Sequence, residues 1–207
     1  MTGNKKAHWE SVYTSKQPDA VSWFAPHLGS SMELLRRAGL GASSRLIDVG
    51  AGASTLVDDL LDMGVQQVTA VDISDAALQV ARLRLGTRAA SVRWIVSDIL
   101  IVPLLANAYD LWHDRAALHF LTDPADAQRY ADIAANAIAV GGHAIIGGFG
   151  REGPAQCSQL SVTRREPEDI AQLFGPRFEL RESRHEVHQT PWGSPQAFAF
   201  ALLRKTS

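Results

Sequence analysis

The feature that most constrains this chain is a short apolar run ending in a glycine-rich turn, LIDVGAG at residues 46–52. The aliphatic run predicts a buried strand over residues 45–49. Gly50 and Gly52 permit positive φ angles and close approach of the backbone to a ligand. Residues 53–63 follow with apolar side chains at helical spacing, so the turn joins a strand to a helix. This is how nucleotide-binding sheets begin a ligand site.

The same alternation of short β-branched runs with longer amphipathic runs continues along the chain, which predicts an α/β fold with a mostly parallel sheet. Further strands are expected at residues 67–71, 92–96, 109–112, 143–147, 177–187 and 196–203. Further helices are expected at residues 7–15, 31–38, 76–85 and 123–139. Ser74 or Asp75 should cap the third of these helices, and Asp123 the fourth. Gly141 and Gly142 are expected to end the fourth helix.

Composition limits the classes of function that this chain can have. Its 207 residues suit one domain, residues 1–207. A net charge of −2 gives no reason to expect a nucleic-acid partner. The single cysteine, Cys157, excludes an internal disulfide and disfavours structural zinc. No third ligand accompanies His185 and His188, so no metal site is expected and both are interpreted as surface residues. The polar segment 1–10 and the absence of a long apolar run predict a cytoplasmic protein without membrane contact.

Acidic residues end the first three predicted strands. Asp48 precedes the glycines, where a carboxylate suits an ammonium group better than a phosphate, and Thr55 replaces the third glycine of the dinucleotide motif. Asp72 follows the turn by about 20 residues, the spacing of an acid that holds ribose hydroxyls. Asp98 and Ile99 can bond the amino group of an adenine and cover its ring. The alternative is a set of tight strand-end turns with capping acids.

A further polar cluster ends the fourth predicted strand, where parallel sheets bind ligands. His113 is expected to contact a cofactor or a substrate. Asp114 and Arg115 follow it, and the alternative for these two residues is that they pair with each other. His119 is expected to be structural.

Together these segments resemble the motifs of class I methyltransferases that use S-adenosylmethionine (SAM). Residues 48–52 look like motif I, Asp72 like motif II, residues 98–99 like motif III, and residues 109–115 like motif IV. The resemblance covers roughly residues 45–203. It implies a Rossmann-like, doubly wound, seven-stranded sheet, mostly parallel with an antiparallel last strand. It also implies SAM as the methyl donor and S-adenosylhomocysteine (SAH) as the product.

The resemblance implies a role for individual residues. Gly50 would bind the methionine part of SAM, Asp72 the ribose, and Asp98 with Ile99 the adenine. The complete set expected to bind the cofactor is Tyr13, Trp23, Asp48, Gly50, Ala51, Gly52, Asp72, Ile73, Asp98, Ile99 and His113.

The segment before the first strand is rich in aromatic residues. Residues 1–44 are expected to form a helical cap on a SAM-binding core at residues 45–207. Trp9 and Tyr13 lie one helical turn apart and share a face. With Trp23, they resemble aromatics of a bacterial group of small methyltransferases, and of thiopurine and thiol methyltransferases, where such residues cover the cofactor. The alternative is that they only staple the N-terminal segment to the core.

The resulting hypothesis is a bacterial enzyme that methylates a small molecule at oxygen, nitrogen, sulfur or a metalloid, as a monomer or homodimer. The N-terminal aromatics also match some lysine methyltransferases, so a protein lysine methyltransferase remains an alternative, as does a non-catalytic nucleotide-binding protein. Tyr13 and His113 are the candidate catalytic residues, although a base is optional when the acceptor is already a thiolate or a neutral amine. Cys157 either faces the substrate or is a small buried hydrophobe.

Overall fold

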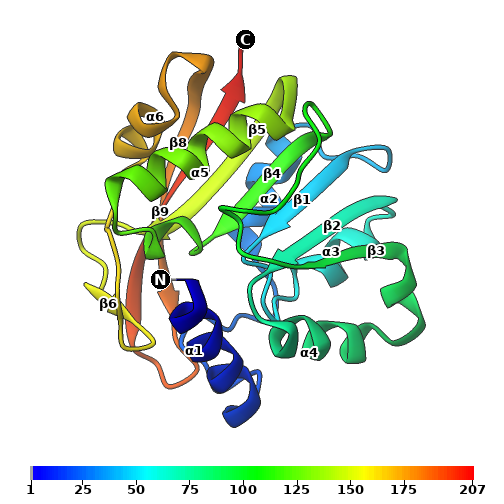
Figure 1. The fold of residues 1–207 in the computed structure, drawn as a ribbon, viewed down its shortest axis with the longest axis vertical. Helices are drawn as coiled ribbons and strands as arrows, with labels where there is room; N and C mark the ends of the chain where they lie inside the picture. The colour runs from blue at the N-terminus through cyan, green and yellow to red at the C-terminus, as the bar shows by residue number, and fades with distance from the viewer. Residues whose placement is uncertain (1) are drawn as a thin grey trace.

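The computed structural model describes residues 2–207, with side chains from residue 5 onward. Its centre is a seven-stranded sheet of order β3-β2-β1-β4-β5-β9-β8 (Figure 1). The first five of its strands in chain order pair in parallel, and β9 runs antiparallel to both of its neighbours. The predicted mostly parallel sheet with an antiparallel last strand is therefore confirmed, and that strand lies second from one edge.

The strands are β1 (Arg45–Val49), β2 (Gln67–Asp72), β3 (Val92–Val96), β4 (Tyr109–Arg115), β5 (Ile138–Phe149), β8 (Phe178–Gln189) and β9 (Pro195–Lys205), with a two-stranded hairpin of β6 (Gln156–Cys157) and β7 (Leu160–Ser161). The helices are α1 (Thr2–Ser15), α2 (Gly29–Arg37), α3 (Leu56–Asp62), α4 (Asp75–Leu85), α5 (Pro124–Ala137) and α6 (Pro167–Phe174). Short 3-10 helices are η1 (Gly86–Ser91), η2 (Leu118–Phe120) and η3 (Gly175–Arg177).

Helices cover both faces of the sheet and bury two separate cores. In Figure 1, α5 and α6 lie in front of the strands, and α2 and α3 lie behind them. The alternation along β1 shows how one strand serves both layers, because Leu46 belongs to the core under α2, α3 and α4, whereas Ile47 belongs to the core under α5 and α6. The largest fully buried side chain, Trp112, lies in the second core.

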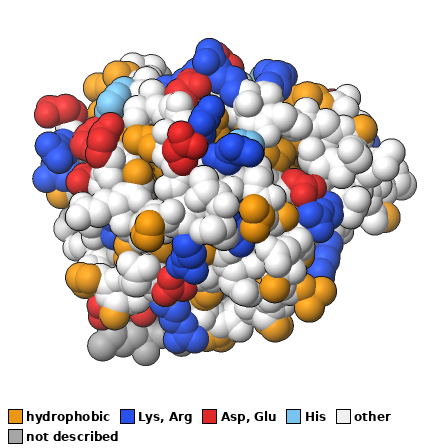
Figure 2. All heavy atoms as spheres, turned by 90° about the horizontal axis from the view of Figure 1, so that it is seen from above, with side chains coloured by type: hydrophobic (Ala, Val, Ile, Leu, Met, Phe, Trp, Pro, Cys, Tyr) orange, Lys and Arg blue, Asp and Glu red, His pale blue; other side chains and the backbone are white. Residues whose placement is uncertain are grey.

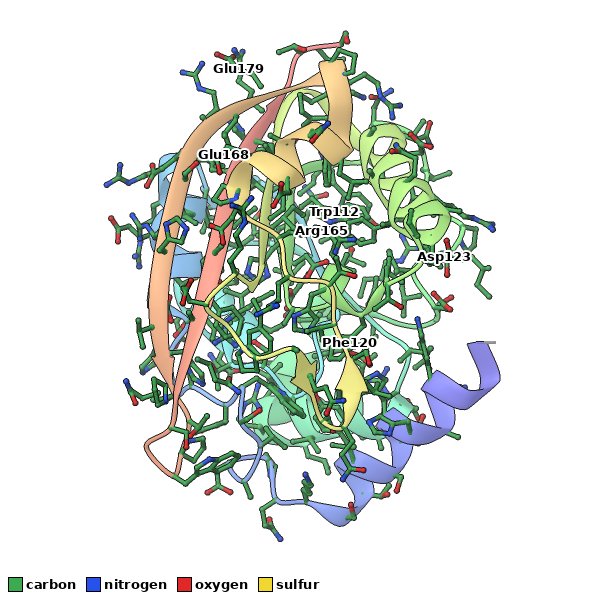
Figure 3. The ribbon with its side chains drawn as sticks, turned by 90° about the vertical axis from the view of Figure 1, so that its left-hand side faces the viewer. Trp112, Phe120, Asp123, Arg165, Glu168 and Glu179 are labelled. Atoms are coloured by element: carbon green, nitrogen blue, oxygen red, sulfur yellow. The ribbon has the colours of Figure 1, made fainter. Side chains whose placement is uncertain are left out.

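Two of the predicted helix caps are present. The hydroxyl of Ser74 accepts a hydrogen bond from the amide of Ala77 at the start of α4. The carboxylate of Asp123, labelled in Figure 3, accepts one from the amide of Ala125 at the start of α5. These bonds satisfy amides that have no partner within the helix, so both helices begin where the sequence indicates.

The boundary between α5 and β5 differs from the prediction. The helix ends at Ala137, and the strand begins at Ile138, before the two glycines that were expected to end the helix. Ile138 pairs with Tyr109 of β4, so pairing with the neighbouring strand overrides the local helical pattern. Gly142 lies inside the strand, where an added Cβ would be 2.7 Å from the carbonyl oxygen of Asp110.

The surface at the end of the molecule opposite α1 is mixed in charge. Figure 2, which views that end, shows basic and acidic side chains interspersed. Within residues 2–207 no helix is both long and apolar enough to cross a bilayer.

Candidate functional site

A cavity lies at the carboxyl ends of β1 to β4, beside α1, where parallel sheets place their ligands. A smaller pocket adjoins it on the side of α2 and the glycine turn. Tyr13, Trp23, Gly50 and Arg115 line both spaces, so these four residues form the partition between them.

The glycine turn has the conformation that the sequence predicts. Gly50 and Gly52 have φ angles of 67° and 54°. A Cβ at Gly50 would lie 2.6 Å from the Cβ of Ala117, and one at Gly52 would lie 2.6 Å from the hydroxyl of Tyr13. Both positions therefore exclude side chains, because the chain itself approaches the turn so closely.

Asp72 ends β2 beside this turn. Its Oδ2 accepts a hydrogen bond of 2.8 Å from the amide of Gly52, and its Oδ1 accepts one of 2.8 Å from the amide of Ser74. Burial, with the charges of Asp48 and Glu10, outweighs these bonds and raises the pKa of Asp72 to about 6. A carboxylate has about four lone-pair sites, so this fixed group can accept further donors from the cavity.

Asp48 and His113 form a buried pair in the smaller pocket. The Nδ1 of His113 lies 2.7 Å from Oδ1 of Asp48, and its Nε2 lies 2.9 Å from the hydroxyl of Ser31. Within the described chain, Oδ2 of Asp48 has no hydrogen-bond partner. Ala51 lines the same pocket. Both nitrogens of His113 are thus engaged with protein atoms, and it lies on the α2 side of the partition.

The other predicted cofactor residues line the larger cavity. Ile73 follows β2, and Asp98 and Ile99 follow β3. The Oδ1 of Asp98 accepts a hydrogen bond of 2.9 Å from the amide of Leu100, which orients the carboxylate. The structure therefore brings the acid that ends β2 and the acid that follows β3 to the wall of one cavity.

Glu10 of α1 caps the start of α4, a role that the sequence does not indicate. Its carboxylate accepts hydrogen bonds from the amides of Asp75 at 2.8 Å and Ala76 at 3.1 Å, and from the hydroxyl of Ser74 at 3.2 Å. Anions are stabilised at helix N-termini, so these bonds dock α1 on the core. The partners are more than sixty residues apart in the chain, so no local pattern reveals the contact.

The N-terminal aromatics form one cluster at the cavity. The ring of Trp9 lies 5.7 Å from that of Trp23 and 5.0 Å from that of Phe120, measured between centroids. Tyr13 lies 6.3 Å from Trp9, so the predicted shared face is present. Figure 3 shows Phe120 at the level of α1 and the β6–β7 hairpin. Burial and the charge of Asp72 raise the pKa of Tyr13 well above its usual value, which keeps its hydroxyl protonated.

The far side of the larger cavity is built by residues that the sequence did not assign to the cofactor. Phe149 ends β5, Phe198 lies on β9, and Cys157 lies on the hairpin. The guanidinium of Arg115 lies over the ring of Phe198, 4.7 Å from its centroid, and its Nη1 donates a 3.0 Å hydrogen bond to the carbonyl of Trp23. This half is mainly aromatic.

The expected alternative, a pair between Asp114 and Arg115, is wrong. Neighbouring residues of a strand point to opposite faces, so Asp114 faces the core under α5. There it accepts hydrogen bonds from the amides of Ala117 and Leu118 and from the hydroxyl of Tyr130, and it holds the turn after β4 in place. Burial raises the pKa of Asp114 to about 6, against the effect of these bonds.

Cys157 and His119 are both buried at the cavity wall. Burial raises the pKa of the Cys157 thiol to about 11, so it is uncharged. Burial, with the charges of Arg165 and Arg115, lowers the pKa of His119 to about 3, which leaves a neutral imidazole. Neither ring nitrogen of His119 has a hydrogen-bond partner among residues 2–207.

One of the two histidines interpreted as surface residues is buried. His188 is only 6% exposed, and its Nε2 lies 2.8 Å from the carbonyl of Ser22. Its packing near Phe198 depends on the N-terminal segment, which strand periodicity does not reveal. His185 is exposed and pairs with Glu166 at 2.7 Å.

Comparison with known proteins identifies the core. Residues 46–142 match the family described as "Methyltransferase domain". An eEF1A lysine and N-terminal methyltransferase of Mus musculus is 23% identical over 117 residues. That alignment spans 56% of this chain but 16% of the mouse protein, so the chain corresponds to a small part of that relative.

Two solved structures share the fold. The N-methyltransferase NodS from Bradyrhizobium japonicum, in complex with SAH, is 20% identical with a TM-score of 0.75, covering 99% of this chain and 100% of the other. A 1,6-didemethyltoxoflavin-N1-methyltransferase from Burkholderia thailandensis, with its substrate and SAH bound, is 21% identical with a TM-score of 0.71, covering 100% and 87%. Residues 46–142 thus match a methyltransferase domain, and the chain shares the fold of two methyltransferases solved with SAH.

Proposed function

We propose that this protein is a methyltransferase that transfers the methyl group of SAM to a small-molecule acceptor at oxygen, nitrogen, sulfur or a metalloid. The observation that carries the proposal is the placement of two carboxylates, Asp48 and Asp72, on either side of one glycine turn. SAM has a cationic amino group at one end of its methionine part and a ribose with two hydroxyls at the other. The free Oδ2 of Asp48 suits the first, and the fixed carboxylate of Asp72 suits the second.

Each predicted cofactor residue then receives a role. Asp48 accepts the ammonium group, Asp72 the ribose hydroxyls, and Asp98 the adenine amino group, as the resemblance implies. The remaining contacts are assigned to Gly50, Ala51, Gly52, Ile73 and Ile99, whereas His113 acts through Asp48. The exclusion of a Cβ at Gly50 and Gly52 supports this, because only glycine lets the turn bend so closely beside Tyr13 and the carboxylate of Asp72.

The N-terminal segment completes the site in this proposal. Residues 1–44 act as a cap on residues 45–207, and the whole chain works as one domain. Tyr13 and Trp23 are placed to close over the cofactor, because they stand in the partition between the two spaces. Their aromatic faces suit a sulfonium cation.

The chemistry requires positioning more than acid–base catalysis. When bound, SAM would supply a transferable methyl group on a positively charged sulfur, with SAH as the product. The chain must hold the two reactants in line and keep water out. Tyr13 is suited to donate a hydrogen bond at the partition because its hydroxyl stays protonated. His113 is engaged by Asp48 and Ser31, so its proposed role is to orient Asp48.

The aromatic side chains around the half of the cavity beside Phe198 favour a small acceptor over a protein side chain. Trp9 and Phe120 pack against each other on its α1 side, and Phe149 and Phe198 pack at the sheet. These rings suit a compact apolar molecule. The alignment with the mouse lysine and N-terminal methyltransferase supports the alternative of a protein acceptor.

Calorimetric titration with SAM, SAH and NAD tests the cofactor assignment. The variant is Asp72→Asn, and its matched control is Asp75→Asn, which changes an exposed carboxylate three residues away. Hydrogen bonds to a charged group contribute about 1.5–3 kcal/mol, so Asp72→Asn should weaken SAH binding by roughly ten- to a hundredfold. The control should bind as the wild type does. Binding of NAD instead of SAH, or of neither, would overturn the proposal.

Transfer of labelled methyl from SAM then tests the acceptor class. Small thiols, amines, phenols and carboxylic acids are compared with a mixture of intact proteins under the same conditions. We expect label in the small-molecule fraction. Label confined to lysines of the proteins would establish the alternative.

A further inference from the structure

We propose that the acceptor is a small aromatic molecule carrying a carboxylate, with the carboxylate bound by Arg115 and the ring packed in the aromatic half of the cavity. This inference rests on the proposed function and names the class of substrate for the same site.

The guanidinium of Arg115 has donors to spare. It has five N–H groups, and the structure assigns one hydrogen bond, from Nη1 to the carbonyl of Trp23. Its Nη2 is shielded from solvent and has no partner anywhere in residues 2–207. The nearby carboxylate that acts on its charge is Glu186, which does not form a hydrogen bond to it in the described chain. An incompletely paired guanidinium away from water is costly, and a bidentate carboxylate offsets that cost.

The position of Arg115 favours the acceptor over the cofactor. Its guanidinium lies on the ring of Phe198, and Phe198 lines the larger cavity but not the pocket that contains Asp48. Cys157 and His119 also line the larger cavity and not the smaller pocket. The charge of Arg115 reaches both side chains: it opposes the effect of burial on the pKa of Cys157 and adds to that effect on the pKa of His119. The stacking on Phe198 therefore turns the guanidinium toward the larger cavity.

Arg115 is the charged group of that half. The thiol of Cys157 and the imidazole of His119 are both uncharged at neutral pH. Lys5 reaches the cavity from α1, where its Nζ donates to the carbonyl of Phe120. The acids that line the cavity are Asp72, Asp98 and Asp126, which come from β2, the segment after β3, and α5. Of the two cations that line the cavity, Arg115 is the one beside Phe198, and a cation on an apolar wall is suited to one anionic group on an otherwise apolar ligand.

Aromatic side chains supply the rest of this half. The rings of Phe149 and Phe198 lie 5.0 Å apart between centroids at an interplanar angle of 75°. Trp9 and Phe120 lie at the same separation on the α1 side. Flat rings pack well against such edges and faces, so an aromatic ring is favoured over a flexible chain.

The test measures binding of 2-naphthoate and 2-naphthamide to the SAH-saturated protein. The two probes match in shape and differ in charge. We expect naphthoate to bind at least about tenfold more tightly than naphthamide, because an arginine–carboxylate pair is a charge-assisted bond. In Arg115→Gln the preference should fall to within about twofold, with SAH affinity also within about twofold of wild type. The control Arg165→Gln, which changes a part-buried arginine bonded to the carbonyls of Leu118 and Leu121, should keep the preference.

Each other outcome contradicts the inference in a distinguishable way. Equal binding of the probes, or binding of neither, overturns the acceptor class while SAH binding leaves the proposed function intact. A wild-type protein that does not bind SAH overturns both. If Arg115→Gln weakens SAH but not 5′-methylthioadenosine, which lacks the amino-acid part, Arg115 serves the carboxylate of the cofactor. If Arg115→Gln does not fold, Arg115→Lys retains the charge without the planar fork and should reduce the preference several-fold; an unchanged preference would overturn the inference.

Discussion

Substitution of Gly50 tests whether packing against Ala117 holds the glycine turn in its conformation. In Gly50→Ala the new methyl group would meet the Cβ of Ala117 at 2.6 Å, at a φ of +67°. The left-handed conformation costs a residue with a side chain about 1–2 kcal/mol, and overpacking costs about 1–3 kcal/mol. Gly50→Ala should therefore lower the free energy of unfolding by about 2–5 kcal/mol.

Two further variants separate the strain from the contact. Gly64 has a φ of +79°, and a Cβ added there would meet no described atom within 4 Å. Gly64→Ala should therefore lower the free energy of unfolding only by the cost of backbone strain, about 1–2 kcal/mol. Ala117→Gly removes the atom that Gly50→Ala meets, at a cost of about 0.5–1 kcal/mol alone. The double variant Gly50→Ala/Ala117→Gly should then recover about 1–3 kcal/mol relative to the sum of its single changes.

Urea denaturation followed by circular dichroism measures all four variants. In a chain of this size, each kcal/mol corresponds to roughly 2–4 °C in melting temperature, so thermal scans give an independent check. If the effects of Gly50→Ala and Ala117→Gly add to within about 0.5 kcal/mol, the contact between them carries no energy and the reasoning is refuted. The reasoning is also refuted if Gly50→Ala lowers the free energy of unfolding by no more than Gly64→Ala does.

Three further predictions follow from the site and its supports. Glu10→Ala should speed hydrogen exchange at the amide of Ala76 by about tenfold, since loss of a charged cap costs roughly 1.4 kcal/mol; unchanged exchange there would show that Glu10 does not dock α1. Because the pKa of Asp72 is raised to about 6, it gains a proton as the pH falls through 6, and SAH affinity should drop about tenfold from pH 7 to pH 5; Asp72→Asn should bind with a flat pH profile over this range. Tyr130→Phe should lower the free energy of unfolding by about 2–4 kcal/mol in urea titrations, because it leaves Nε1 of Trp112 buried without its acceptor, and a loss below 1 kcal/mol would contradict this.

The sequence predicts local features of this protein better than long-range ones. The bounds of β1 and β3 and the cap at Ser74 agree with the structure, because each depends on neighbouring residues. The start of β5 at Ile138 depends on pairing with β4, so a helical pattern misplaces it. The short helix α6 and the β6–β7 hairpin were missed, since each is too short for a clear period.

The candidate site divides in the same way. The acids at strand ends are visible in the sequence because strands, turns and spacing place them. The position of Arg115 against Phe198 is not visible, since the two residues meet only when β9 pairs beside β5. Glu10 is hidden for the same reason, because its partners lie on a distant helix.

The layout of the cavity has a consequence for how such a protein diversifies. The acids that we propose bind the cofactor lie between residues 48 and 98, whereas Arg115, Phe149, Cys157 and Phe198 follow them in the chain. Substitutions in the later stretch can thus alter the shape and charge of one half while the other is inherited unchanged. Recombination at a point between β3 and β4 would exchange one ligand preference for another as a unit, and α1, which contacts both halves, is the element that would then have to adapt.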